Sequence, residues 1–594
     1  MKNTRILLHT AGIGGLFWFL GLSLGWAQTT PHEKNGANYS ATYTEAIAFY
    51  EELANGSPLV EVKTYADGTD AGLPLHLVVI TNNPVKHPVP LRQADRRFVL
   101  ILNGIHPGEP CGVDASMALA RDLATQPAYK SMLEHLVVCI VPVYNVGGAL
   151  NRNSTSRANQ NGPDGYGFRG NARLLDLNRD FIKADSRNAQ TFNRIFTEWR
   201  PDVFIDTHTS NGADYQYTMT YIPTQKDKVH PAVAEYMNTV LNPQLEAKLK
   251  ENYPMCPYVQ TMGWQTPPDS GISAFLETPR YSTGYAALYN TIGYTTESHM
   301  LKPFADRVGG TYTFMLELLK YVNRDRTTIG RMRRDADASV QKQEEFTLRW
   351  ALDPTVSHPI NFRGYTATTI TSQVTGQDRL TYDQNQPWTR EIPYYDTYKP
   401  VIKVKKPYAY IVPQAWREAV ERLEWNGVAL KRLGEDVKVP VEVSYLDKFQ
   451  PSPRPYEGHY PISGIELRRE TQVLQFRAGD YVVFTDQVAN RYIVETLEPE
   501  AHDSYLHWNF FDEIFQRKEY FSPYIFEETA QKMLETDPAL KQKLQEKIQS
   551  DSSFVNNDWA QLDFIYRNSP HYEPSHLRYP VVRINEKQKL PLAK

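Results

Sequence analysis

The sequence predicts an α/β fold for the first half of the chain, from two features of its hydrophobic pattern. Continuous apolar runs at 98–102, 136–143 and 202–206 are typical of strands buried inside a sheet. Helical patterns at 185–199 and 231–251 lie on either side of the third run. Strands that alternate with helices in this way indicate an α/β domain.

The length of 594 residues indicates more than one domain. After about residue 335 the pattern changes. Strand-like 409–412, helical 416–425 and the alternating stretch 437–443 form one β-α-β unit in an aromatic-rich region. The second half is therefore predicted to be an α/β or α+β accessory domain of unknown function.

We divide the chain into four predicted parts. Residues 1–27 are a signal peptide, residues 40–335 the catalytic domain, residues 336–400 a linker or irregular region, and residues 401–594 the accessory domain. The accessory domain is expected to buttress or cap the catalytic one. The sequence gives no indication of the oligomeric state.

The N-terminus and the composition indicate where the protein works. Lys2 and Arg5 precede an apolar, Gly-rich run from Ala11 to Trp26, and a small-x-small site ends at Ala27. This pattern predicts an exported protein, periplasmic or secreted, with an uncleaved membrane anchor as the alternative. No later segment is long enough to span a bilayer. The net charge of −4 and pI of about 6.5 argue against a nucleic-acid partner.

Two separate strand ends carry residues suited to one metal ion. His106 and Glu109 occupy the turn after the 98–102 strand, and His208 follows the 202–206 strand. Ligands bind at the carboxyl ends of strands in open α/β sheets. Two imidazoles and a carboxylate are the donor set of a catalytic zinc site with a position left for water. Alone, the His-x-x-Glu spacing is a weak signal that fits a polar turn better than a metal site.

Further polar residues would complete a hydrolytic site. Glu297 ends the strand-like stretch 293–297 and is suited to take a proton from water, although an exposed strand-end glutamate would look the same. The stretch 169–181 presents Arg169, Arg173 and Arg179, whose guanidinium groups can grip a carboxylate through two hydrogen bonds. Such a run can also be a solvated surface.

Together these motifs resemble the zinc carboxypeptidase family typified by carboxypeptidase A. The motifs are His-Pro-Gly-Glu followed by Gly112, Arg-Gly-Asn-Ala-Arg-x-x-Asp-Leu-Asn-Arg-Asp-Phe, Asp-Thr-His and Thr-Thr-Glu, in family order over residues 40–325. The Asp-x-Asn-Arg core is the most specific of them. The resemblance implies a mixed sheet flanked by helices, one zinc ion, and a peptide substrate with a free C-terminal carboxylate.

The resemblance also implies a role for each matching residue. The zinc ligands would be His106, Glu109 and His208, and Asp176 would orient His106. The substrate carboxylate would be held by Asn178 and Arg179. The developing oxyanion would be stabilised by Arg169, with Arg173 as a rival. The general base, and then the acid for the leaving amine, would be Glu297.

Two positions depart from the family pattern. Residue 108 is Gly where many members place an arginine. The family's mobile tyrosine has no match at a reliable spacing, although Tyr281 and Tyr285 are near, and Tyr281 is our candidate.

The predicted function is a zinc metallocarboxypeptidase of an exported compartment. Two alternatives use the same fold: an N-acyl amino-acid deacylase similar to aspartoacylase, and a peptidoglycan stem-peptide amidase. A non-catalytic peptide- or glycan-binding protein is the alternative from another class.

Overall fold

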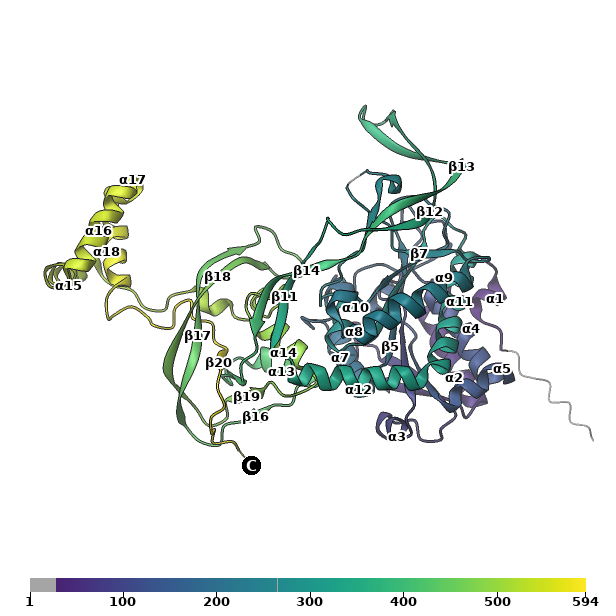
Figure 1. Ribbon diagram of the computed structural model, residues 1–594, viewed down its shortest axis with the longest axis horizontal. Coiled ribbons are helices and arrows are strands. Elements are labelled where there is room, and N and C mark those ends of the chain that lie inside the picture. The colour runs from purple at the N-terminus through teal and green to yellow at the C-terminus, as the bar shows by residue number, and fades with distance from the viewer. Residues whose placement is uncertain (1–27, 264, 594) are drawn as a thin grey trace, which may run out of the picture.

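The computed structural model describes residues 28–263 and 265–593, so the predicted signal peptide lies outside the described residues. The first half of the chain is the predicted α/β fold, built on an eight-stranded mixed sheet (Figure 1). Across the sheet the order is β1 (Val60–Tyr65), β2 (Leu75–Ile80), β4 (Leu136–Val141), β3 (Arg97–Leu102), β5 (Val203–Ser210), β10 (Ile292–His299), β6 (Met219–Pro223) and β7 (Met255–Pro257). No helix among the described residues is long and apolar enough to cross a membrane.

The four central strands, β4, β3, β5 and β10, run parallel. Their carboxyl ends therefore meet at one edge of the sheet, where His106, His208 and Glu297 lie. Helix α4 (Cys111–Thr125) begins directly after the turn that follows β3. It packs so closely on β5 that a Cβ at Gly112 would come within 2.0 Å of Thr207 Oγ1. Only glycine at position 112 allows this approach.

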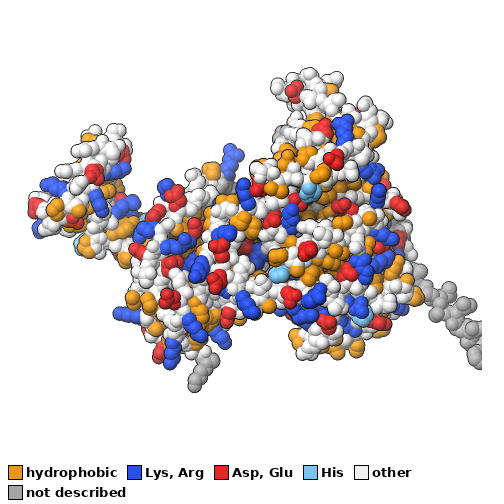
Figure 2. All heavy atoms as spheres, viewed as in Figure 1, with side chains coloured by type: hydrophobic (Ala, Val, Ile, Leu, Met, Phe, Trp, Pro, Cys, Tyr) orange, Lys and Arg blue, Asp and Glu red, His pale blue; other side chains and the backbone are white. Residues whose placement is uncertain are grey.

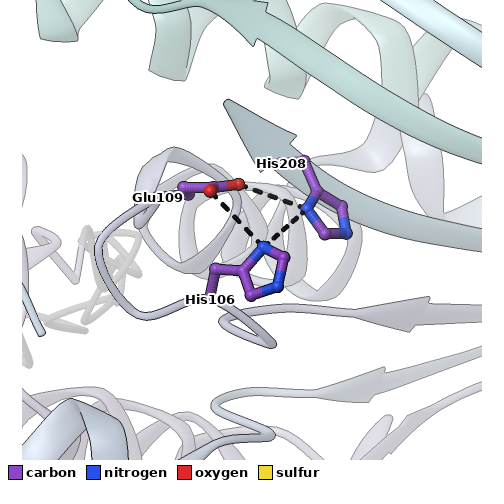
Figure 3. A group of neighbouring side chains, drawn as sticks. All are labelled: His106, Glu109 and His208. Atoms are coloured by element: carbon purple, nitrogen blue, oxygen red, sulfur yellow. Dashed lines mark hydrogen bonds and ion pairs between the residues drawn. The ribbon is translucent and has the colours of Figure 1, made fainter. Parts of the chain in front are cut away.

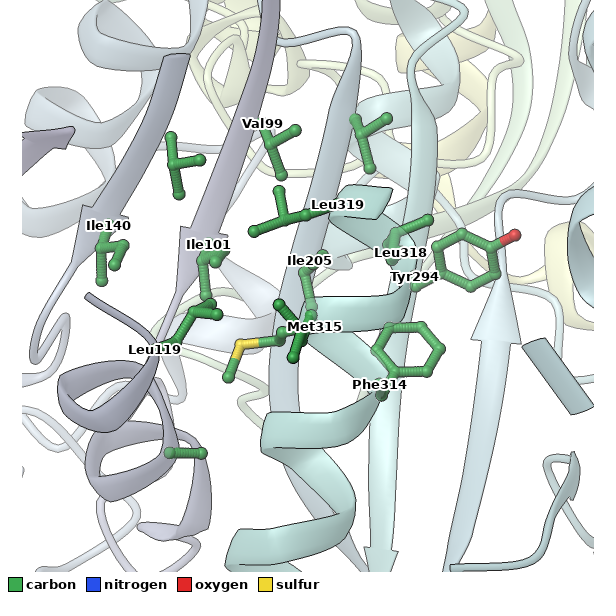
Figure 4. Packing of buried hydrophobic residues seen from close by; sticks show 14 of the residues in the cluster. Val99, Ile101, Leu119, Ile140, Ile205, Tyr294, Phe314, Met315, Leu318 and Leu319 are labelled. Carbon is green, nitrogen blue, oxygen red and sulfur yellow. The ribbon is translucent and has the colours of Figure 1, made fainter. Parts of the chain in front are cut away.

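Helices cover both faces of the sheet because successive side chains of each strand point to opposite faces. One core contains Val99, Ile101 and Ile205 with side chains of α4 and α11 (Phe304–Arg324), as Figure 4 shows. Helices of the first half also include α1 (Pro31–Asn35), α2 (Tyr43–Gly56), α3 (Pro88–Gln93), α5 (Pro127–Lys130), α6 (Val146–Leu150), α7 (Arg187–Trp199), α8 (Pro231–Tyr236), α9 (Asn242–Leu249) and α10 (Ser282–Leu288).

The core on the opposite face continues into the second half of the chain. Phe196 of α7 and Tyr285 of α10 share it with Tyr410, Leu423 and further apolar side chains of the second half. Helix α12 (Arg326–Lys342) runs between the two halves (Figure 1). The two halves are therefore packed through a common apolar core.

The second half has an α+β architecture. Its six-stranded antiparallel sheet has the order β16 (Lys431–Arg432), β19 (Tyr481–Phe484), β15 (Ala409–Val412), β20 (Val582–Ile584), β17 (Val437–Pro451) and β18 (Ile462–Phe476). Helices α13 (Arg417–Trp425) and α14 (Asn490–Leu497) pack on it. The predicted β-α-β unit is β15, α13 and β17, with β20 inserted between the two strands.

The prediction that 336–400 is a linker or irregular region is wrong. Beyond the end of α12 this stretch contains β11 (Glu345–Leu352), β12 (His358–Thr371) and β13 (Asp378–Tyr395), and β11 pairs with β14 (Tyr398–Lys405). Strands β12 and β13 form a long arm (Figure 1). The outer part of the arm is exposed on both faces, so it lacks the alternation of apolar and polar residues by which strands are recognised.

A small helical lobe projects from the second half (Figure 1). It consists of α15 (Pro523–Thr536), α16 (Pro538–Ser550), α17 (Ser552–Val555) and α18 (Asp558–Arg567) and has an apolar core of its own. On the face of the molecule in Figure 2, basic and acidic side chains are interspersed.

Candidate metal centre and active site

Three side chains converge at the carboxyl edge of the sheet (Figure 3). One ligand atom from each of His106, Glu109 and His208 lies within 4.8 Å of the others, and all three residues are buried. The two Nδ1 atoms are 3.1 Å apart, and the Glu109 carboxylate oxygens lie 3.4 Å and 3.2 Å from them. The structure thus brings together the three predicted ligands.

The hydrogen bonds around the two imidazoles test whether this group fits a metal ion. His106 Nε2 lies 2.8 Å from Asp176 Oδ1, and His208 Nε2 lies 2.9 Å from Asp206 Oδ2. Because a carboxylate accepts, a proton on Nε2 would serve each of these hydrogen bonds and leave the inward-facing Nδ1 lone pair for a metal ion. Two lone pairs and a carboxylate that face one another require a cation, and this donor set fits zinc.

The pKa shifts of His208 and Glu109 also favour a positive charge within this group. Burial opposes the charged form of His208, but Asp206 and Glu109 raise the pKa of its imidazole well above the usual value. Burial also opposes ionisation of Glu109, but Arg157 and His106 hold the pKa of its carboxyl well below the usual range. Glu109 therefore stays ionised as a ligand should.

Arg157 is a residue of the site that the sequence did not reveal. It reaches from the long loop after α6 and donates from Nη1 to Glu109 Oε1 over 2.7 Å. A Cβ on Gly108 would lie only 3.1 Å from Arg157 Cδ. The glycine that departs from the family pattern thus leaves room for a guanidinium supplied by another segment. Nothing in the local sequence around Arg157 marks it.

Asp206 was also missed, although a signal was present. It lies two residues before His208, and residues two apart in a strand share one face of the sheet. The Asp-Thr-His motif therefore places a carboxylate beside the ligand imidazole.

Glu297 lies on β10 directly beside His208, its Cα partner on the parallel strand β5. Its Oε2 atom is buried and has no hydrogen-bond partner among the described residues. Burial raises the pKa of Glu297 to about 8, although the neighbouring His208 acts in the opposite direction. A carboxylate with a raised pKa next to the metal ligands is suited to take a proton from water.

The predicted arginine segment separates into residues that face the site and one that does not. Arg169 donates from Nε to Asp176 Oδ2 over 2.9 Å, and its Nη1 lies 3.5 Å from Glu109 Oε1. Arg173 instead donates to the main-chain oxygen of Asp185. The geometry therefore favours Arg169 over its rival.

Arg179 and Asn178 follow Asp176 in one short 3-10 turn (Leu177–Arg179). The Arg179 guanidinium carbon lies 4.4 Å from the centre of the Tyr281 ring. Tyr285 is fully buried, and its hydroxyl donates to Asn426 Oδ1 over 2.6 Å. Of the two candidate tyrosines, Tyr281 is thus the one beside the arginine.

Comparisons with known proteins find similarity to zinc carboxypeptidases. Residues 47–254 match the family model described as zinc carboxypeptidase. The chain is 22% identical to carboxypeptidase 2 of Trichophyton tonsurans over 447 residues, 68% of this chain and 72% of that protein. It is 30% identical to carboxypeptidase 2 of Trichophyton rubrum over 107 residues, 18% of this chain and 20% of the other. The solved carboxypeptidase A of Helicoverpa armigera gives a TM-score of 0.36 at 15% identity, covering 48% of this chain and 73% of that one.

Proposed function

We propose that the protein removes the C-terminal residue of peptides. The premise is that the first half of the chain is a domain of the zinc carboxypeptidase family, whose members are peptidases that use one zinc ion. The observation that carries the proposal is the convergence of His106, Glu109 and His208, near which the segment 169–179 places two guanidinium groups. The Arg169 guanidinium lies 3.5 Å from Glu109, and the Arg179 guanidinium lies 3.8 Å from Asp176.

The arginines divide the work of substrate binding. Arg179 and the amide of Asn178 would hold the terminal carboxylate, because a guanidinium offers paired donors that match two carboxylate oxygens. Arg169, whose Nη1 is 3.5 Å from the ligand Glu109, would donate to the carbonyl oxygen of the scissile bond as negative charge develops there. A substrate held at both points presents its last peptide bond to the site.

Bound zinc supplies Lewis-acid chemistry, polarising a carbonyl and making water a better nucleophile. Glu297 Oε2 takes a proton from the attacking water as the water oxygen bonds to the carbonyl carbon. Glu297 Oε2 then gives that proton to the amide nitrogen as the carbon–nitrogen bond breaks. The products are a shortened peptide and a free amino acid.

We also propose that the protein works outside the cytoplasm, in a periplasm or secreted. The support is the pattern of Lys2, Arg5 and the apolar run that ends at Ala27. N-terminal sequencing of the protein from its producing cell should begin at Gln28. A chain that retains Met1 or Lys2 would contradict export by cleavage.

The alternatives from the sequence are not favoured. The curated relatives from Trichophyton are named carboxypeptidases, and not deacylases or amidases. The complete set of ligands, base and anchoring arginine also argues against a protein that only binds.

The decisive assay uses N-blocked dipeptides with a free or an amidated C-terminus. The enzyme should release an amino acid from the free acid, lose activity with a zinc chelator, and regain it when zinc is added. Hydrolysis that persists after zinc is fully removed, or that is equally fast with the amide, would overturn the proposal.

A further inference from the structure

A hairpin tip from the second half of the chain reaches the part of the active site that contains Arg179. We call residues 456–459, in the connection between β17 and β18, the tip hairpin. Tyr456 and His459 exchange main-chain hydrogen bonds of 2.8 Å and 3.1 Å across it. The two residues between them, Glu457 and Gly458, have φ angles of 50° and 81°. Two positive φ angles are typical of a type I′ turn, which matches the twist of paired strands.

The tip hairpin contacts the segment that carries the arginine anchor. Glu457 Oε2 accepts a hydrogen bond of 2.8 Å from the main-chain N–H of Asp176. Tyr456 Oη accepts one of 3.1 Å from Arg179 Nε. His459 Nε2 lies 2.7 Å from Asp185 Oδ2 a few residues farther on. These contacts hold the tip on this segment at three points.

The ring of Tyr456 is itself supported by the second half. It stacks on Trp508 with ring centres 6.2 Å apart and an angle of 19° between the planes. Trp508 is fully buried, so the phenol stands on a rigid base. The second half therefore supports the ring of Tyr456, and its hydroxyl contacts Arg179 of the first half.

The tip restricts the orientation of the Arg179 guanidinium. Nε donates to Tyr456 Oη, Nη1 donates to the main-chain oxygen of Asn178 over 2.7 Å, and one face lies against the Tyr281 ring. The Nη2 atom has no hydrogen-bond partner among the described residues. The fixed groups leave an Nη edge to receive a carboxylate, since guanidinium donors lie in one rigid plane.

We propose that Tyr456 is a positioning residue for the reaction: its hydroxyl fixes Arg179 in the orientation that grips the C-terminal carboxylate of the substrate. The inference rests on the proposed function and deepens it. It gives the second half of the chain a direct part in recognising the end of a peptide, through one phenol oxygen.

The test compares Tyr456→Phe with Tyr460→Phe in the full chain. Tyr456→Phe removes one oxygen and keeps the ring on Trp508. Tyr460 is the matched control, since it lies in the same connection and is 52% exposed. Its main-chain N–H and oxygen bond to the side chain of Asn509, and its hydroxyl has no hydrogen-bond partner among the described residues. Both variants are assayed on an N-blocked dipeptide with a free carboxylate and on its C-terminal amide.

Tyr456→Phe should raise KM for the free acid about fivefold to tenfold, within the range expected for the loss of one ordinary hydrogen bond, with kcat within about twofold. Hydrolysis of the amide should not change, and Tyr460→Phe should behave as the wild type. In an Arg179→Ala background, Tyr456→Phe should have no further effect, because the two residues act as one unit. An unchanged KM, an equal loss on acid and amide, or an additive double variant would overturn the assignment.

A binding measurement separates this proposal from the proposed function. Calorimetry with an N-blocked amino acid reports carboxylate binding whether or not peptides are hydrolysed. If the wild type binds this ligand through Arg179 without hydrolysing any peptide, the proposed function fails, and weaker binding by Tyr456→Phe still supports the positioning role. Equal binding by the two proteins, or no Arg179-dependent binding at all, overturns it.

Discussion

The part of the site with the predicted metal ligands (the metal side) and the part with Arg179 (the anchoring side) are built in different ways. His106, Glu109, His208 and Glu297 all come from parallel strands of one sheet or the turns that follow them, so the sheet fixes their spacing. The Arg179 side depends on a contact between residues 176–179 and a tip hairpin almost three hundred positions away. The predicted metal ligands are thus placed by one half of the chain, whereas the proposed anchoring residues are supported by both halves.

Separating the two halves is the most drastic way to break this comparison. A chain that ends after residue 342 would expose Tyr285, Phe196 and the rest of the face that packs on Tyr410 and Leu423. We expect it to be insoluble or inactive, because such a face is stable only when covered. Soluble yield and hydrolysis of the free-acid dipeptide measure the effect.

Deletion of the helical lobe, residues 523–567, is the control for truncation. The lobe has its own apolar core, so its removal should leave activity near the wild-type level. A soluble and fully active chain ending at 342 would show that the metal side needs nothing from the second half.

Glu297→Gln tests the chemistry of the metal side alone. The amide keeps the size of the side chain but cannot take a proton, so kcat should fall about 10²- to 10⁴-fold. The zinc content should stay at one ion per chain, as measured by atomic absorption, because Glu297 is not a predicted ligand. Loss of both zinc and activity would mean that Glu297 supports the ligand cluster instead.

Asp176→Asn and Asp206→Asn sharpen the comparison, since each carboxylate holds one ligand imidazole. Each variant should weaken zinc binding about 10- to 100-fold in a competition with a chelator. Only Asp176 also contacts Arg169 and lies 3.8 Å from Arg179. Asp176→Asn should therefore raise KM for the free-acid substrate as well, whereas Asp206→Asn at saturating zinc should not. An equal rise in KM for both variants would show that the two sides are coupled through both carboxylates.

The prediction with the smallest expected effect on activity concerns the stability of the junction of the two halves at low pH. His507 accepts a hydrogen bond from Arg280 Nη2 and donates one to the main-chain oxygen of Ile462. Burial lowers the pKa of His507 to about 4. Between pH 6.5 and 4 the unfolded chain thus binds more protons than the folded one at this site. The free energy of unfolding should fall in that window, by about 2–3 kcal/mol from this residue.

The measurement is the urea midpoint of the wild type and of His507→Gln at pH 7 and pH 4.5. Glutamine can make both hydrogen bonds without titrating, so the variant should lose less stability on acidification. A parallel decline of the two proteins would contradict the role of His507.

The part of the site that could be predicted from the sequence is the part encoded by short segments. His106 and Glu109 share one turn, Asp176 to Arg179 share another, and both follow patterns of strand and spacing that are local. Arg157, Tyr456 and Glu457 reach the site only through tertiary contacts, and nothing near them in the sequence shows which segment they contact. The arm of β12 and β13 was missed for a related reason, because its exposed side chains carry no apolar alternation.

The distance along the chain between the tip hairpin and Asp176 has a consequence for biosynthesis. Polypeptides are made from the N-terminus, and their domains generally fold in that order. Every predicted zinc ligand is present once residue 208 has been synthesised, but the support for Arg179 arrives only when residue 456 has been added. A nascent chain thus contains all the proposed zinc ligands well before it contains the tyrosine proposed to orient Arg179, so this part of the site can be completed only late in synthesis.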